Sequence, residues 1–154
     1  MLEALPSRPR HLLVGRPEAL AAALGPLPPN TSREMSGGGR LLWLRPDQWL
    51  LLGGRPATAG EVTILDAGAR FVEFGIAGAG AADLLAAGCS LDFRERAFAP
   101  GRCAQSRIEQ VPVTLHREAL DRFTVIVERP LARYLWRWLQ HSAALLGDGG
   151  GEMA

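Results

Sequence analysis

The chain has 154 residues, of which 47% are hydrophobic and 21% charged, and its formal net charge is +1. This length suits one domain or two closely fused small lobes, and the composition is typical of a folded protein rather than a disordered one. The balanced charge gives no reason to expect nucleic acid as a partner, and the absence of lysine excludes Schiff-base and P-loop lysine chemistry.

The N-terminal part of the chain combines an expected arm, a strand, a helix and a long loop. Residues 1–10, with two prolines among charged residues, are expected to form a flexible arm. They lack the layout of a signal peptide, and the chain has no apolar run of 18 residues, so we expect a cytoplasmic protein without a membrane span. Residues 11–14 predict a short strand, and Pro17 opens a helix that Gly25 ends. The proline- and glycine-rich residues 27–39 predict a loop.

Two pairs of strands are expected next. The apolar runs 41–44 and 49–52 flank a Pro46-Asp47 turn, which is typical of a hairpin. Both runs are apolar on both faces, so the hairpin is expected in the centre of a sheet. Residues 62–65 and 71–76 predict a second pair.

A glycine-rich turn and a short helix follow the 71–76 strand. Residues 78–83 form a G-x-G-x-x-D pattern, similar to the dinucleotide-binding fingerprint. However, Asp83 replaces the third glycine, and no acidic residue stands about 20 residues further on, near Arg102. The pattern therefore favours a glycine turn into a packed helix over a nucleotide site. Gly88 is placed to end that helix with a left-handed cap.

The C-terminal part predicts three more strands and a long helix. The strands are expected at 103–109, 111–116 and 123–127. In the second, Val111, Val113 and Leu115 alternate with Pro112, Thr114 and His116 on the polar side, the pattern of a half-buried strand. Pro130 opens the last helix, and residues 147–154 are expected to form a disordered tail. The apolar stripe of the last helix is predicted to consist of Leu131, Tyr134, Leu135, Trp138 and Leu139.

These elements predict an α+β fold with antiparallel sheets and helices packed on them. A single domain is expected over residues 11–146, made of two fused lobes at about 11–66 and 67–146.

The residues capable of chemistry do not form a recognisable active site. His11, His116 and His141 have no second ligand at metal-binding spacing and are expected to be solvent-facing or hydrogen-bonded. Cys89 and Cys103 lack a C-x-x-C pattern, so each is expected in an apolar interior, with a disulfide as the alternative. The serines lack the G-x-S-x-G elbow. No catalytic, cofactor-binding or metal-binding residue is predicted in this chain.

Trp136 is the most informative aromatic residue. It lies about 140° around the last helix from the predicted apolar stripe, between Arg133 and Arg137. Trp and Arg carry much of the binding energy at protein interfaces, so these three residues are a candidate partner interface. The alternative, that Trp136 packs against another part of the same chain, stays open.

Four segments share their order and spacing with the motifs of a known family. Residues 44–52 read L-R-P-D-Q-W-L-L-L, residues 78–92 hold A-A-D-L-L-A-A-G-C-S-L-D, residues 98–108 begin F-A-P-G, and residues 125–139 end Y-L-W-R-W-L. They resemble the L-G-P-D-E-W-L-L hairpin, the L-L-x-x-G-C-P-L-D-L helix and turn, the F-x-x-G segment and the Y-L-W-x-x-L helix of the gamma subunit of heterotetrameric sarcosine oxidase. The resemblance covers about residues 20–146. Arg45 stands where that family usually has glycine.

This resemblance implies ferredoxin-like lobes, as in the folate-binding domain of the glycine-cleavage aminomethyltransferase. It also implies a small accessory subunit whose alpha, beta and delta partners hold FAD, FMN, NAD and tetrahydrofolate. Such a complex demethylates sarcosine or a related N-methyl amino acid and passes formaldehyde to tetrahydrofolate. No catalytic residue is expected in this subunit.

Two other functions remain open from the sequence. A free-standing folate-binding or one-carbon-transfer protein would need an acidic residue facing a pocket, for which Asp66 and Glu73 are the candidates. A stand-alone interaction module without a metabolic role is the third possibility.

Overall fold

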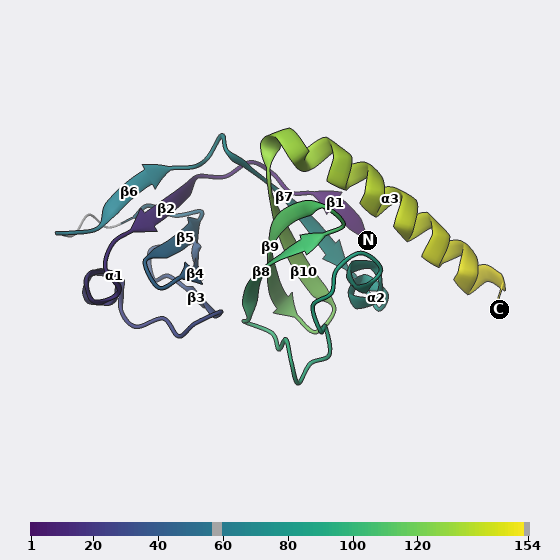
Figure 1. Ribbon diagram of the computed structural model, residues 1–154, viewed down its shortest axis with the longest axis horizontal. Coiled ribbons are helices and arrows are strands. Elements are labelled where there is room, and N and C mark those ends of the chain that lie inside the picture. Colours follow the sequence, from purple (N-terminus) through teal and green to yellow (C-terminus); the bar gives the residue numbers. More distant parts are fainter. Residues whose placement is uncertain (57–59, 153–154) are drawn as a thin grey trace.

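The computed structural model describes residues 1–56 and 60–152, and in this part of the chain the strands form two antiparallel five-stranded sheets (Figure 1). The first sheet has the order β3–β4–β5–β2–β6, with β2 Arg10–Val14, β3 Ser32–Glu34, β4 Arg40–Arg45, β5 Gln48–Leu52 and β6 Thr63–Asp66. The second has the order β1–β7–β10–β9–β8, with β1 Leu2–Ala4, β7 Phe71–Ala77, β8 Cys103–Ile108, β9 Val111–Ala119 and β10 Arg122–Glu128. The helices are α1 Pro17–Leu24, α2 Ala81–Ala86 and α3 Arg129–Glu152. The predicted α+β class with two antiparallel lobes is confirmed.

The first sheet is covered on both faces. Its hairpin β4–β5 lies inside the sheet, as predicted, and successive leucines of β5 point to opposite sides. Leu51 packs with Leu20 of α1 in an outer cluster, whereas Leu50 packs with Leu42 and Ile126 between the two sheets. An almost continuous apolar run is the pattern that a strand buried on both faces requires.

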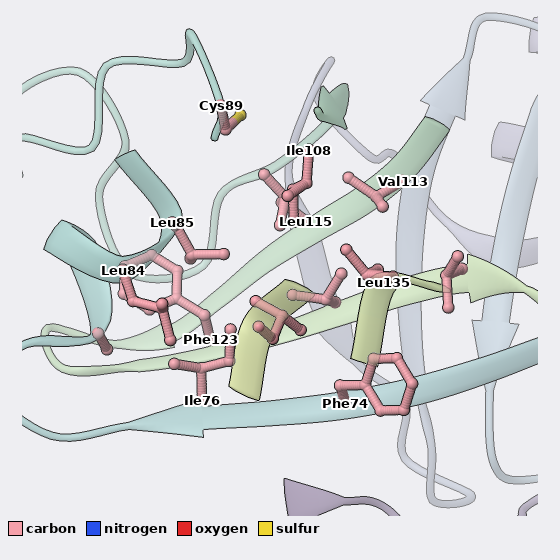
Figure 2. Close-up of a cluster of buried hydrophobic side chains, with 14 of the residues drawn as sticks. Phe74, Ile76, Leu84, Leu85, Cys89, Ile108, Val113, Leu115, Phe123 and Leu135 are labelled. Atoms are coloured by element: carbon pink, nitrogen blue, oxygen red, sulfur yellow. The ribbon is translucent and has the colours of Figure 1, made fainter. Parts of the chain in front are cut away.

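The second sheet packs its outer face against α2 and α3. Figure 2 shows Phe74, Ile76, Leu115 and Phe123 of the sheet together with Leu84 and Leu85 of α2 and Leu135 of α3. The chain therefore forms four layers: α1, the first sheet, the second sheet, and the pair α2 and α3. Because both sheets contribute side chains to the middle, polar residues on the inner faces are taken out of water.

Two expectations about the ends of the chain differ from the structure. Within the expected arm 1–10, Leu2–Ala4 form β1, which pairs with β7 and covers what would otherwise be an open sheet edge. At the other end, where a disordered tail was expected at 147–154, α3 continues to Glu152. A helix that is already nucleated adds each further residue at low cost. Residues 153 and 154 lie outside the described part.

The predicted left-handed cap at Gly88 is wrong. The glycines with positive φ do not include Gly88, and α2 ends at Ala86 with Ala87 in right-handed helical geometry. Instead, a Cβ at Gly88 would lie 2.5 Å from Cζ2 of Trp138. The glycine is needed because the indole of α3 lies directly on the backbone that follows α2.

Candidate functional site

The three residues predicted as an interface lie on α3 in different surroundings. Arg133 and Arg137 are exposed, whereas Trp136 is half-buried and belongs to the cluster beneath the helix. Its ring lies 4.9 Å from the ring of Phe74, centroid to centroid, at an interplanar angle of 44°. This contact favours the same-chain alternative for Trp136 and leaves the two arginines on the outer side.

The predicted apolar stripe of α3 is partly wrong. Leu135 and Leu139 are buried as predicted, but Tyr134 is 55% exposed and Leu131 36% exposed. The face that packs on the sheet continues towards Trp136 instead. Apolar residues occupy well over half of the helix circumference in this segment, so periodicity alone did not reveal where the buried face is centred.

A buried ion cluster joins the N-terminal segment to β7. Glu73 is fully buried, and its Oε2 accepts a hydrogen bond of 2.7 Å from Nε of Arg10, which is itself 1% exposed. Oε1 accepts a bond of 2.6 Å from Nη2 of Arg8. Arg10 also donates to the carbonyl oxygen of Gly68 at 2.9 Å. Both carboxylate oxygens of Glu73 are thus already bound by guanidinium groups, as a buried charge requires.

Asp66, the other acidic candidate for holding a folate ring, caps a turn. Its Oδ1 accepts a bond of 2.9 Å from the backbone N–H of Gly68, and the side chain is exposed at the end of β6. This is an Asx-type turn, which stabilises the crossing from the first sheet to the second.

The buried His116 and the half-buried Ser32 form a hydrogen-bonded pair between the sheets. Nε2 of His116 lies 2.8 Å from Oγ of Ser32, which also lies 3.0 Å from the carbonyl oxygen of Gly101. Nη1 of Arg40 donates to the same hydroxyl at 3.3 Å. Burial, with the nearby Arg40 charge, lowers the pKa of His116 to about 4, so the imidazole is neutral at neutral pH. The prediction that one side of β9 faces water is wrong at His116, because the first sheet covers that side.

The two cysteines are separate free thiols in the interior. Cys103 donates to the carbonyl oxygens of Thr31 and Trp43, both at 3.3 Å, and burial raises its pKa to about 11. Cys89 lies 3.4 Å from Oγ of Ser106. The buried apolar role expected for both is the one observed. Cys103 remains a thiol at neutral pH and is therefore a poor nucleophile.

The glycine turn before α2 borders an apolar hollow rather than a dinucleotide site. All strand pairs of the second sheet are antiparallel, so β7 and α2 are not part of a parallel βαβ unit in the described residues. The hollow has a volume of about 440 Å³ and lies between this turn, the N-terminus and the far part of α3. Its lining includes Met1, Ile76, Leu84 and Leu146.

A second hollow, of about 300 Å³, opens between the β4–β5 hairpin and the second sheet. Arg45 and Gln48 line it from the hairpin, and Arg70 and Glu128 line it from the opposite side. Nη2 of Arg70 lies 2.7 Å from Oε1 of Glu128, so the charges of these two side chains balance each other within the chain.

Over the described ranges 1–56 and 60–152, no group of three or more His, Cys, Asp or Glu residues is arranged to hold a metal ion. None of the helices in that part of the chain is long and apolar enough to cross a membrane.

The sequence and the fold are similar to those of several known proteins. A family model described as "Sarcosine oxidase, gamma subunit family" matches residues 17–145. The sarcosine oxidase subunit gamma of Arthrobacter sp is 30% identical over 139 residues, covering 79% of this chain and 66% of that relative. The chain thus spans just under two thirds of that relative's length.

Two solved structures share the fold. A chain of the heterotetrameric sarcosine oxidase from Corynebacterium sp. U-96, in complex with pyrrole 2-carboxylate, aligns with a TM-score of 0.82 and 22% identity, covering 94% of this chain and 83% of that one. Aminomethyltransferase T of the glycine cleavage system from Bartonella henselae aligns with a TM-score of 0.66 and 17% identity, covering 90% of this chain and 44% of that one. At these identities the likeness concerns the two-lobed architecture.

Proposed function

The chain belongs to the sarcosine oxidase gamma subunit family, and from this premise we propose that it is the accessory gamma subunit of a heterotetrameric, flavin-dependent sarcosine oxidase. The proposed complex demethylates sarcosine or a related N-methyl amino acid and passes the formaldehyde to tetrahydrofolate. Its alpha, beta and delta subunits would hold FAD, FMN, NAD and tetrahydrofolate. The match of the family model over residues 17–145 carries the proposal.

A non-catalytic role for this subunit is supported by the state of its polar interior. Glu73 is held between two arginines, His116 is neutral and bonded to Ser32, and Cys103 is kept as a thiol. Each of these side chains bonds to a residue of the other lobe. The free-standing folate-binding alternative loses support because both carboxylate oxygens of Glu73 are bound by arginines. Asp66 lies exposed at the end of β6, with its Oδ1 bonded to the backbone N–H of Gly68.

Co-expression tests the proposal. The chain, with an affinity tag at its N-terminus, is produced together with the alpha, beta and delta subunits of the same organism and purified through the tag. We expect all four subunits to elute together with a flavin absorption spectrum and to consume oxygen when sarcosine is added. Elution of the tagged chain alone, with the other subunits folded in the flow-through, would contradict the proposal.

A further inference from the structure

Helix α3 has a second apolar face that the body of the protein covers only in part. Of the seven large hydrophobic side chains that are exposed in the described residues, four lie on α3, with Tyr134 and Leu145 the most exposed at 55% and 60%. Figure 1 shows the helix along the outer side of the second lobe, with its C-terminal part projecting beyond α2. Helix α3 therefore exposes apolar side chains on the surface of the second lobe.

Three of the four exposed apolar residues of α3 lie on one flank of the helix, together with Trp138. Leu131, Tyr134, Trp138 and Leu145 are spaced by three, four and seven residues, which places them within an arc of about 60° along about 21 Å of helix. Trp138 is half-buried against Gly88, and the other three are exposed. Apolar residues at such spacing are the side chains that a helix offers to a second helix lying along it. We call these four residues the α3 flank.

The arginines beside the α3 flank have no ion-pair partner among the described residues. Arg133 and Arg137 are exposed, and neither forms an ion pair in the described part. Residues 129–147 carry three arginines and no acidic residue, a formal charge of +3 that leaves −2 for the rest of the chain. Elsewhere on the surface, Arg16 and Arg94 each pair with a nearby carboxylate. The positive charge is concentrated where the apolar flank is.

We propose that the α3 flank, with Arg133 and Arg137, docks a helix of a large subunit that carries an apolar stripe edged by acidic residues. Charge complementarity selects this occupant, because an acidic edge would meet arginines about 60° to 100° around the helix from Tyr134. If a second copy of this chain bound here, Arg133 and Arg137 of the two copies would lie close together, and such repulsion between like charges disfavours association. The inference rests on the proposed function, since it assigns the surface through which this subunit joins the complex.

The test compares variants in the co-expressed complex of tagged chain with alpha, beta and delta subunits. Tyr134→Glu and the double variant Arg133→Glu/Arg137→Glu alter the proposed surface, and Leu65→Glu, at a side chain 48% exposed on β6 in the other lobe, is the matched control. Circular dichroism of each purified chain verifies folding. We expect association with the large subunits to weaken about tenfold or more for the two surface variants and to stay unchanged for the control.

Salt dependence and crosslinking identify the occupant. Binding of the wild-type chain is expected to weaken as ionic strength rises from about 0.05 to about 0.5 M, and the double arginine variant should lose most of this dependence. A photo-reactive phenylalanine derivative at position 134 should crosslink to a helix with acidic residues in a large subunit. A crosslink to a segment without acidic residues would overturn the proposal.

The outcomes separate the two proposals. Failure of the wild-type chain to assemble contradicts the proposed function, and the docking surface falls with it. If the wild-type complex forms and both surface variants assemble equally well, the docking surface is wrong and the proposed function stands. A Tyr134-dependent dimer of the isolated chain, or Tyr134-dependent binding to vesicles of anionic phospholipid, would also overturn the assignment to a large subunit.

Discussion

Replacing Gly88 by alanine tests the close packing of α3 on the segment after α2. The added Cβ would lie 2.5 Å from Cζ2 and 2.6 Å from Cη2 of Trp138, and 3.3 Å from Cγ2 of Ile108. Favourable carbon–carbon contacts begin near 3.5 Å, so the indole would have to move by about 1 Å. Gly88 does not adopt a positive φ, and the cost therefore arises from this clash rather than from backbone strain.

The expected cost of Gly88→Ala is about 1–3 kcal/mol in the free energy of unfolding, the usual range for overpacking a dense interior. Alanine also lowers the conformational entropy of the unfolded chain relative to glycine, which stabilises the folded state by about 0.4–1 kcal/mol. The expected net decrease in the free energy of unfolding is therefore about 1–2 kcal/mol. Urea denaturation followed by tryptophan fluorescence and circular dichroism measures it. In a chain of this size each kcal/mol corresponds to a fall of about 2–4 °C in the melting temperature.

Two further variants make the reasoning refutable. Gly80→Ala is the matched control, because Gly80 has φ −90° and no atom lies within 4 Å of the added Cβ, so its stability should stay within about 0.5 kcal/mol of wild type. Trp138→Leu removes the clashing ring, and the double variant with Gly88→Ala should be more stable than the sum of the single losses predicts. Wild-type stability of Gly88→Ala, or strictly additive losses in the cycle, would refute the packing argument.

The interior between the lobes yields two further predictions. Glu73→Gln should lower the free energy of unfolding by about 3–5 kcal/mol, because it leaves the buried Arg10 without its counter-charge. Arg8→Gln should cost clearly less, since the Arg8 side chain is 39% exposed, and equal losses in urea denaturation would contradict this ranking. Burial lowers the pKa of His116 in the folded protein to about 4, below the value of about 6.5 in the unfolded chain. The contribution of the neutral imidazole to the free energy of unfolding is therefore fully present above pH 6.5 and declines as the pH falls towards 4, by up to about 1.4 kcal/mol per pH unit. Denaturation midpoints measured across this pH range should fall less steeply for His116→Asn than for wild type, and parallel curves for the two proteins would show that another group titrates.

Local patterns in the sequence were sufficient for most of the elements. The central β4–β5 hairpin followed from two apolar runs around Pro46-Asp47, and the turn before α2 from its glycines. These patterns act over a few residues, through side-chain alternation and the backbone freedom of particular residues, and so can be interpreted without the tertiary fold.

Misassigned features depended on which surfaces meet. The alternation in the sequence predicts His116 on the polar side of a strand, yet the first sheet covers that side and leaves the residue 1% exposed. Periodicity predicts Tyr134 in the apolar stripe of the last helix, whereas the sheet contacts α3 closer to Trp136. Periodicity indicates that some face is apolar but does not identify the surface that packs against it.

By itself, the sequence determined the helices, most of the strands, the α+β class and the absence of lysine chemistry, because propensity and periodicity are local properties. The short strands β1 and β3 lie where an arm and a loop were expected. Only the tertiary structure decided that Arg10 and Glu73, 63 positions apart, share a buried charge, and that the aromatic residues of α3 divide between the interior and the surface. Such pairings depend on how two sheets and a helix pack together, and this packing brings together residues that no short stretch of the chain contains.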